Sequence, residues 1–116
     1  MHELSIAMSI AEIVEEEARK AGASRIEIVT IEIGTLSGVM IDALQFAMEE
    51  VMLTTSFSGA KINYDIVTAV ASCEECCNEF VAEDLFKVCP VCNSSKTYYI
   101  RGKELKIKSI EVERDN

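Results

Sequence analysis

The sequence lacks any apolar run close to the roughly 20 residues that a membrane-spanning helix needs. It begins Met1-His2-Glu3 and so lacks the basic and apolar N-terminal regions of a signal peptide. Internal repeats and low-complexity stretches are also missing. These absences favour a soluble, cytoplasmic protein that does not insert into membranes.

Catalytic patterns are scarce as well. The chain has one histidine, far from the cysteines, and we find no paired catalytic carboxylates and no phosphate-binding glycine loop. A thiol oxidoreductase built on Cys73 and Cys76 is the enzyme alternative, and it requires a reactive cysteine of low pKa at the start of a helix in a βαβ unit. That context is missing from the sequence, so we do not expect an enzyme.

Basic residues are few, with 11 Lys and Arg against 20 Asp and Glu and a formal net charge of −9. The first 60 residues carry ten of the acids and only three of the bases. Nucleic-acid binding depends on cationic side chains that displace counterions from phosphates. The composition therefore argues against a nucleic-acid partner and suits a basic protein partner, although surface acidity also serves solubility alone.

Hydrophobic residues make up 49% of the 116 residues, which is enough for the core of about one domain. Apolar residues at helical spacing predict helices over residues 3–21 and 42–54. The expected buried positions are Ala7, Ile10, Val14, Ala18, Leu44, Ala47, Met48 and Val51. Alternating patterns predict strands over residues 25–33, 61–71, 97–101 and 104–113, with a hairpin turn at Gly102-Lys103. The predicted class is α+β: two helices packed on a small, mostly antiparallel sheet, with an inserted zinc-ribbon-like module.

Five cysteines lie in close pairs between residues 73 and 92, which in a reducing compartment indicates metal binding rather than disulfides. Cys73 and Cys76 form one Cys-x-x-Cys turn, and Cys89 and Cys92 form another. Four thiolates complete the tetrahedral shell that structural Zn²⁺ prefers, with no open position. Few large apolar residues surround them, so zinc binding is expected to supply much of the folding free energy. Cys77 is predicted to be a spare thiol, and competition for the metal is the alternative.

His2 stands where an N-terminal chelate would form. The Met1 amine, the His2 amide nitrogen and the His2 imidazole are consecutive donors, and such a planar nitrogen set suits Ni(II) or Cu(II). Glu3 adds a nearby carboxylate, although an acid in the first turn of a helix also complements the helix dipole. A lone histidine is ordinarily a surface or packing residue, so the chemistry alone leaves both interpretations open.

The motifs together resemble those of the HypA/HybF hydrogenase maturation factors over essentially the full length. They are the start Met1-His-Glu-Leu-Ser5, the loop Ile33-Gly-Thr-Leu-Ser-Gly-Val39, the two Cys-x-x-Cys turns and the closing Ile110-Glu-Val-Glu113. The resemblance implies a nickel metallochaperone for [NiFe]-hydrogenase and, in some organisms, urease. It implies nickel at Met1, His2 and Glu3, and structural zinc at Cys73, Cys76, Cys89 and Cys92. The implied partners are a HypB-like GTPase and the hydrogenase large subunit, with the chain itself a monomer or weak homodimer.

One position departs from the family. Members commonly carry an acid after the Ser-Gly-Val loop, linked to the nickel site, whereas this chain has Met40 and its nearest acid is Asp42. Asp42 either substitutes as a ligand or, more simply, caps the second helix.

The expected domains are a nickel-binding α+β domain at 1–71 and 97–116 and a zinc-binding module at 72–96. The rival interpretation is a zinc-ribbon adaptor that binds other proteins without nickel chemistry.

Overall fold

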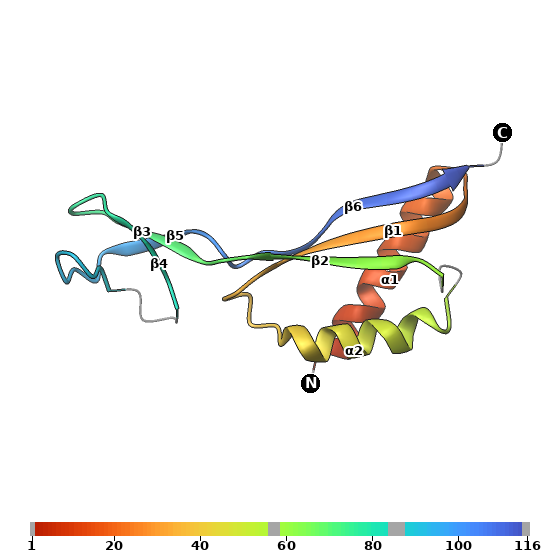
Figure 1. The fold of residues 1–116 in the computed structure, drawn as a ribbon, viewed down its shortest axis with the longest axis horizontal. Helices are drawn as coiled ribbons and strands as arrows, with labels where there is room; N and C mark the ends of the chain where they lie inside the picture. Colours follow the sequence, from red (N-terminus) through yellow and green to blue (C-terminus); the bar gives the residue numbers. More distant parts are fainter. Residues whose placement is uncertain (1, 56–58, 84–87, 115–116) are drawn as a thin grey trace. The chain divides into compact units, whose positions relative to one another are not determined.

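The computed structural model describes residues 2–55, 59–83 and 88–114 (Figure 1). None of the helices in these ranges is long and apolar enough to span a bilayer. The elements in chain order are α1 (Glu3–Lys20), β1 (Ala23–Gly34), α2 (Ile41–Met52), β2 (Lys61–Val67), β3 (Val70–Cys73), β4 (Glu79–Val81), β5 (Thr97–Arg101) and β6 (Leu105–Arg114).

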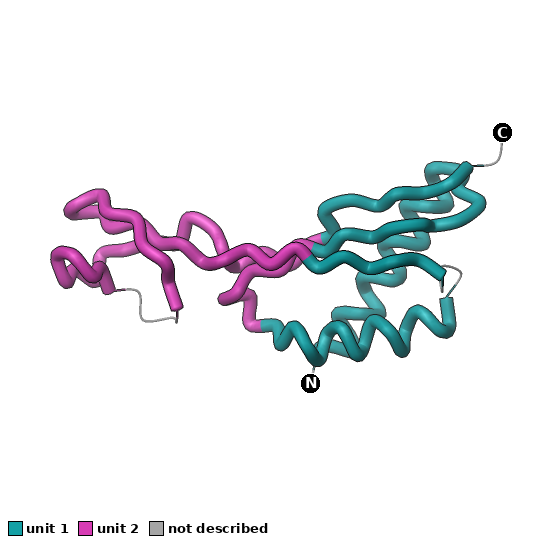
Figure 2. Tube along the Cα trace, viewed as in Figure 1, with its two compact units in different colours: residues 1–31, 39–64, 107–116 teal, residues 32–38, 65–106 magenta. Residues whose placement is uncertain are grey.

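The chain divides into two compact units (Figure 2). The first comprises residues 1–31, 39–64 and 107–116, and the second comprises residues 32–38 and 65–106. The cysteine-bearing unit is therefore larger than the module at 72–96 that was expected from the sequence. Where nickel and zinc bind within the units stays a prediction.

The first unit packs both helices against a sheet with strand order β2-β1-β6. In Figure 1, β6 runs opposite to β1, whereas β2 runs in the same direction as β1. The predicted helical stripes are confirmed, except that Val51 is half-buried and Met52 is buried instead. The core of this unit is formed by residues of both helices and of β1, namely Ala7, Ile10, Ala11, Val14, Ala18, Leu44, Ala47, Met48, Met52, Ile26, Val29 and Ile31.

The second unit is built on an antiparallel sheet with strand order β4-β3-β5. Ala71 of β3 lies between Phe80 of β4 and Tyr99 of β5. The buried cluster on this sheet consists of Ala69, Ala71 and Ala82, with Leu36, Phe80 and Tyr99 packed against it. Three alanines bury little apolar area, so this unit needs another source of stability.

Two sequence expectations about strands are wrong in detail. The strand predicted over residues 61–71 is two strands, β2 and β3, and β4 was not predicted at all. The predicted Gly102-Lys103 hairpin does not form, because β5 and β6 belong to different sheets. Gly102 has φ +110°, and a Cβ added there would lie 2.1 Å from the Cα of Ala69. Only glycine fits this crossing between sheets. The predicted α+β class, with a four-cysteine module, is confirmed.

Candidate metal centres

The four cysteines sit in two turns that repeat the same backbone pattern. In the first turn, the Cys77 N–H donates to the Cys73 carbonyl at 3.0 Å, and the Cys73 N–H donates to the Asn78 carbonyl at 2.9 Å. In the second turn, the corresponding bonds join Asn93 to Cys89 and Cys89 to Ser94, both at 2.9 Å. β3 delivers the first turn directly, since Cys73 is its last residue. Each turn therefore presents two thiols from a backbone that is already hydrogen-bonded.

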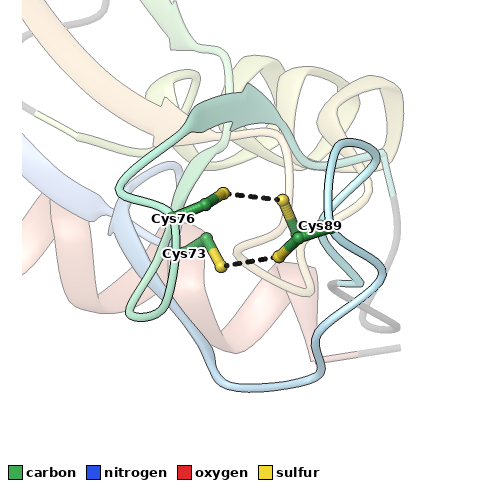
Figure 3. A group of neighbouring side chains, drawn as sticks. Cys73, Cys76 and Cys89 are labelled. Carbon is green, nitrogen blue, oxygen red and sulfur yellow. Dashed lines mark hydrogen bonds between the residues drawn. The ribbon is translucent and has the colours of Figure 1, made fainter.

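The two turns face each other through their sulfur atoms (Figure 3). The Sγ atoms of Cys73 and Cys92 are 3.5 Å apart, and those of Cys76 and Cys89 are 3.6 Å apart. All four sulfurs lie within 4.8 Å of one another. Four sulfurs at about 2.3 Å from a central tetrahedral zinc would be about 3.8 Å apart. The residues present thus fit a closed tetrathiolate site, with Cys73 and Cys89 buried and Cys76 and Cys92 toward solvent.

The environments of the thiols are unequal. The pKa of Cys89 is lowered to about 6, chiefly because the backbone N–H of Cys92 donates to its sulfur, with further help from the N–H of Val91. The hydrogen bond from the Ser94 amide lowers the pKa of Cys92. Hydrogen bonding to the Cys73 thiol, burial and the other two thiols outweigh that effect and raise the pKa of Cys92 to about 12. Four close thiols cannot all ionise without a cation, whereas a bound metal deprotonates its thiol ligands.

Cys77 lies outside the group of four sulfurs that could share a metal. It is exposed and has φ +63°, and Asn93, which follows Cys92 as Cys77 follows Cys76, has φ +64°. Both residues occupy the left-handed conformation that closes their turn, a conformation in which glycine and asparagine are favoured. The backbone position of Cys77 therefore explains its conformation without any role for its thiol. The spacing of the cysteines did not identify Asn93 as a turn residue. The repeated backbone pattern of the two turns does.

The N-terminal candidate residues lie at the start of α1. His2 is exposed and precedes the helix, and its carbonyl accepts the first helical hydrogen bond, from the Ile6 N–H at 2.9 Å. Glu3 is only 6% exposed, and its Oε2 accepts a hydrogen bond from the Met40 N–H at 3.3 Å. Met40 immediately precedes α2, so the Glu3 carboxylate joins the starts of both helices. Met1 lies outside the described residues.

The charge of Glu3 is stabilised at this position. Its pKa is lowered to about 2, first by hydrogen bonding to the positively charged amino terminus and then by the Met40 amide.

The predicted capping role of Asp42 is wrong: α2 begins at Ile41, Met40 is its N-cap residue, and Asp42 lies exposed in the first turn. Met40 makes no side-chain cap, and its side chain is 69% exposed. The sequence analysis did not identify the Met40 backbone N–H as the hydrogen-bond partner of Glu3.

Comparison with known proteins matches the sequence of this chain to one family. The family model for hydrogenase/urease nickel incorporation metallochaperones, HypA, matches residues 1–112. The hydrogenase maturation factor HypA of Parabacteroides distasonis is 41% identical over 115 residues, covering 99% of this chain and 100% of that protein. Its counterpart in Geobacter metallireducens is 39% identical over 113 residues, covering 97% of this chain and all of that protein.

A solved structure agrees. The solution structure of the Ni metallochaperone HypA from Helicobacter pylori superposes with a TM-score of 0.69 at 26% identity, covering 99% of this chain and 100% of that one. The chain therefore belongs to the HypA family of nickel metallochaperones for hydrogenase maturation, and it carries a four-cysteine metal site.

Proposed function

We propose that this protein binds Ni(II) at its N-terminus and delivers it during the maturation of a [NiFe]-hydrogenase in the cytoplasm. The observation that supports this most is the match to nickel metallochaperones across residues 1–112, a range that includes the Met1-His2-Glu3 start. The Met1 amine, the His2 amide nitrogen and the His2 imidazole supply the nitrogen donors.

Glu3 has a double role in this proposal. Its Oε2 accepts the Met40 N–H, which anchors the start of α1 to the start of α2. The carboxylate keeps further lone pairs, with which it assists nickel beside the nitrogen donors. The exposed imidazole of His2 then remains at the surface, where a partner can remove the metal. Micromolar affinity, about −8 kcal/mol, is compatible with such a transfer, because a carrier must release its cargo.

Zn²⁺ is the metal we assign to Cys73, Cys76, Cys89 and Cys92. The tetrathiolate set is closed and soft, which is typical of structural zinc. When bound, zinc cross-links the two turns and supplies the stability that the alanine cluster of the second unit does not. The chain's own contribution is the pair of turns, whose backbone hydrogen bonds hold the cysteines in place.

The partners in this proposal are a HypB-like GTPase and the large subunit of the hydrogenase, and delivery to urease is a further outlet. The chain itself acts as a carrier and not as an enzyme. The acidic first 60 residues suit basic surfaces on these proteins. The competing function is a zinc-ribbon adaptor without nickel chemistry, which the cysteine turns alone would equally support.

Calorimetric titration of Ni(II) into untagged, zinc-loaded protein tests the proposal. The matched variants are His2→Ala, a chain acetylated at the Met1 amine, and Glu12→Gln as a control on the exposed face of α1. Wild type and Glu12→Gln should each bind about one nickel, and the other two should bind at least about 100-fold more weakly, since each loses a chelate donor. Equal binding by all four, or binding by none, would leave the zinc-ribbon adaptor as the better account.

A further inference from the structure

The strand β2 forms one end of the first sheet, and its outer edge is open. In the sheet order β2-β1-β6, no strand of the described residues pairs with β2 on the side away from β1. β2 has seven residues and contains no proline, so each of them keeps its backbone N–H. Such an edge presents N–H and C=O groups to which an extended segment of another chain can pair.

A groove of about 450 Å³ lies beside this strand, between β2 and α2. Figure 1 shows α2 running beside β2. The apolar lining consists of Met48 and Met52 of α2, Ile62 of β2, and Ala60 just before β2. Both methionines are buried, and their unbranched thioether side chains adapt readily to the shape of a bound group.

Three polar side chains line the same groove. Gln45 and Glu49 lie one helical turn apart on α2, and Tyr64 lies on β2. Burial, followed by the charge of Glu49, raises the pKa of Tyr64 to about 12, so the phenol stays protonated at neutral pH. Within the described residues, none of these three side chains forms a hydrogen bond or an ion pair. The groove therefore offers polar groups that the protein itself leaves unused.

The chemistry of the lining favours a cation on an apolar stem. Glu49 is the one charged side chain among the described residues that line the groove. An arginine guanidinium can form two hydrogen bonds with a carboxylate and has further N–H groups for the Gln45 amide oxygen and the Tyr64 hydroxyl oxygen. Its methylene stem would lie on Met52 and Ile62.

The direction of the β2 side chains joins the edge to the groove. Ile62 and Tyr64 are two residues apart, and both line the groove, so this face of β2 turns toward α2. A strand that pairs with the outer edge of β2 directs every second side chain to the same face. One of those side chains therefore reaches the groove while the backbone of the added strand pairs with β2.

We propose that the β2 edge and the α2–β2 groove form a docking site for an extended segment of a partner protein, which pairs with β2 and places an arginine side chain among Gln45, Glu49 and Tyr64. The main-chain hydrogen bonds supply affinity, and the arginine supplies specificity. The site uses none of the residues assigned to nickel or zinc, so it does not depend on the proposed function.

Amide NMR titration of zinc-loaded, nickel-free protein with the capped peptide Thr-Val-Thr-Arg-Thr-Val-Thr tests the proposal. Resonances of residues 45–52 and 61–67 should shift, with a dissociation constant of roughly 0.1–1 mM. Citrulline in place of the arginine keeps the shape without the charge, and Glu49→Gln removes the opposite charge. Each should weaken binding about tenfold, and the two together should weaken it little further, because they remove the same ion pair.

Glu50→Gln is the matched control, since it removes the neighbouring exposed acid, which does not line the groove. It should bind the peptide as wild type does. Strand pairing is tested with two N-methylated peptides, one modified at the odd and one at the even residues. Successive N–H groups of a strand point to opposite edges, so one peptide should lose binding and the other should retain it.

Four results would each overturn the proposal. They are no shifts at 5 mM peptide, shifts confined to other elements, Glu49→Gln binding as tightly as Glu50→Gln, and equal binding of the two N-methylated peptides. Raising the protein concentration without peptide tests the other occupant. If that alone shifts the resonances of residues 61–67, a second copy covers the edge, and the assignment to a partner's arginine segment is wrong.

Discussion

The two candidate metal sites of this molecule differ in how much of each the polypeptide builds in advance. In the second unit, two hydrogen-bonded turns hold four sulfurs within 4.8 Å of one another, at a spacing that suits zinc. At the start of the first unit, His2 is exposed, and the fixed group is the Glu3 carboxylate, which the Met40 amide holds. One site is a preformed shell, and the other is an anchored chain end.

This difference matches two uses of a metal. A closed shell of four thiolates has no vacant position for an incoming ligand, so the metal leaves only if the turns separate. A chelate at a chain end has open positions, and a partner's ligand can enter before the carrier's ligands leave. Under the proposed function, the same small protein would retain one metal as structure and transfer another as cargo, because ligand type and backbone support differ between the two sites.

Removing one thiolate should have the largest effect. Cys89→Ser takes away a buried sulfur and leaves three ligands, so zinc content should fall from about one per chain to near zero. The second unit should then lose its ordered structure, since its own core is chiefly alanine. Metal analysis and amide NMR spectra measure both effects.

Cys77→Ser is the matched control for that experiment. Cys77 directly follows Cys76 in the sequence but lies outside the sulfur cluster. The zinc content of Cys77→Ser should therefore equal that of wild type. Loss of zinc from the Cys77 variant, or full retention in the Cys89 variant, would contradict the assignment of the four ligands.

A smaller effect is expected at the anchor of the other site. Glu3→Gln removes the charge that accepts the Met40 N–H, so the melting temperature at pH 7 should fall by about 5 °C. The pKa of Glu3 in the folded protein is about 2, below its ordinary value of 4.5. The carboxylate therefore contributes stability above pH 4.5, and that stability is lost as the pH falls from about 4.5 toward 2.

Thermal melts of wild type and Glu3→Gln between pH 7 and pH 4 check this, with Glu12→Gln as the exposed control. The gap between wild type and Glu3→Gln should be constant from pH 7 to about pH 5 and begin to narrow below that. A gap that widens on acidification, or an equal loss in Glu12→Gln, would show that the anchor does not act through its charge.

The smallest effect compares the two cysteine turns with each other. Cys77→Gly and Asn93→Gly place glycine at the two left-handed positions, φ +63° and +64°. Glycine adopts this conformation without strain, so the free energy of unfolding of Cys77→Gly should rise by about 0.5–1 kcal/mol. Asparagine already tolerates it, so Asn93→Gly should change the unfolding free energy by less. Guanidinium unfolding of zinc-loaded protein measures both, and a destabilised Cys77→Gly would indicate a structural role for the thiol.

Periodicity in the sequence predicted the helices well, because Ala7, Ile10, Val14 and Ala18 can only share a side if the chain is helical. The cysteine spacing predicted the cluster for a similar reason, since two close pairs need only short turns to meet. Both are local properties, and local patterns persist in the folded chain.

The strand pairing was less predictable. An alternating run over residues 61–71 does not reveal that β2 and β3 pair in different sheets, because alternation specifies a face and not a neighbour. Gly102 appeared to be a turn residue, whereas the close approach of Ala69 is what requires glycine there. The hydrogen bond from Met40 to Glu3 joins residues 37 apart, and no spacing rule connects them.

Release of the two metals into a competing chelator tests the account most directly. Wild-type protein loaded with one zinc and one nickel would be mixed with excess chelator, with metal content and amide NMR spectra followed over time. We predict that nickel leaves first, in a separate phase, while zinc and the spectrum of the second unit persist. Loss of both metals in one phase together with unfolding, or loss of zinc before nickel, would contradict a retained structural site beside a transferable one.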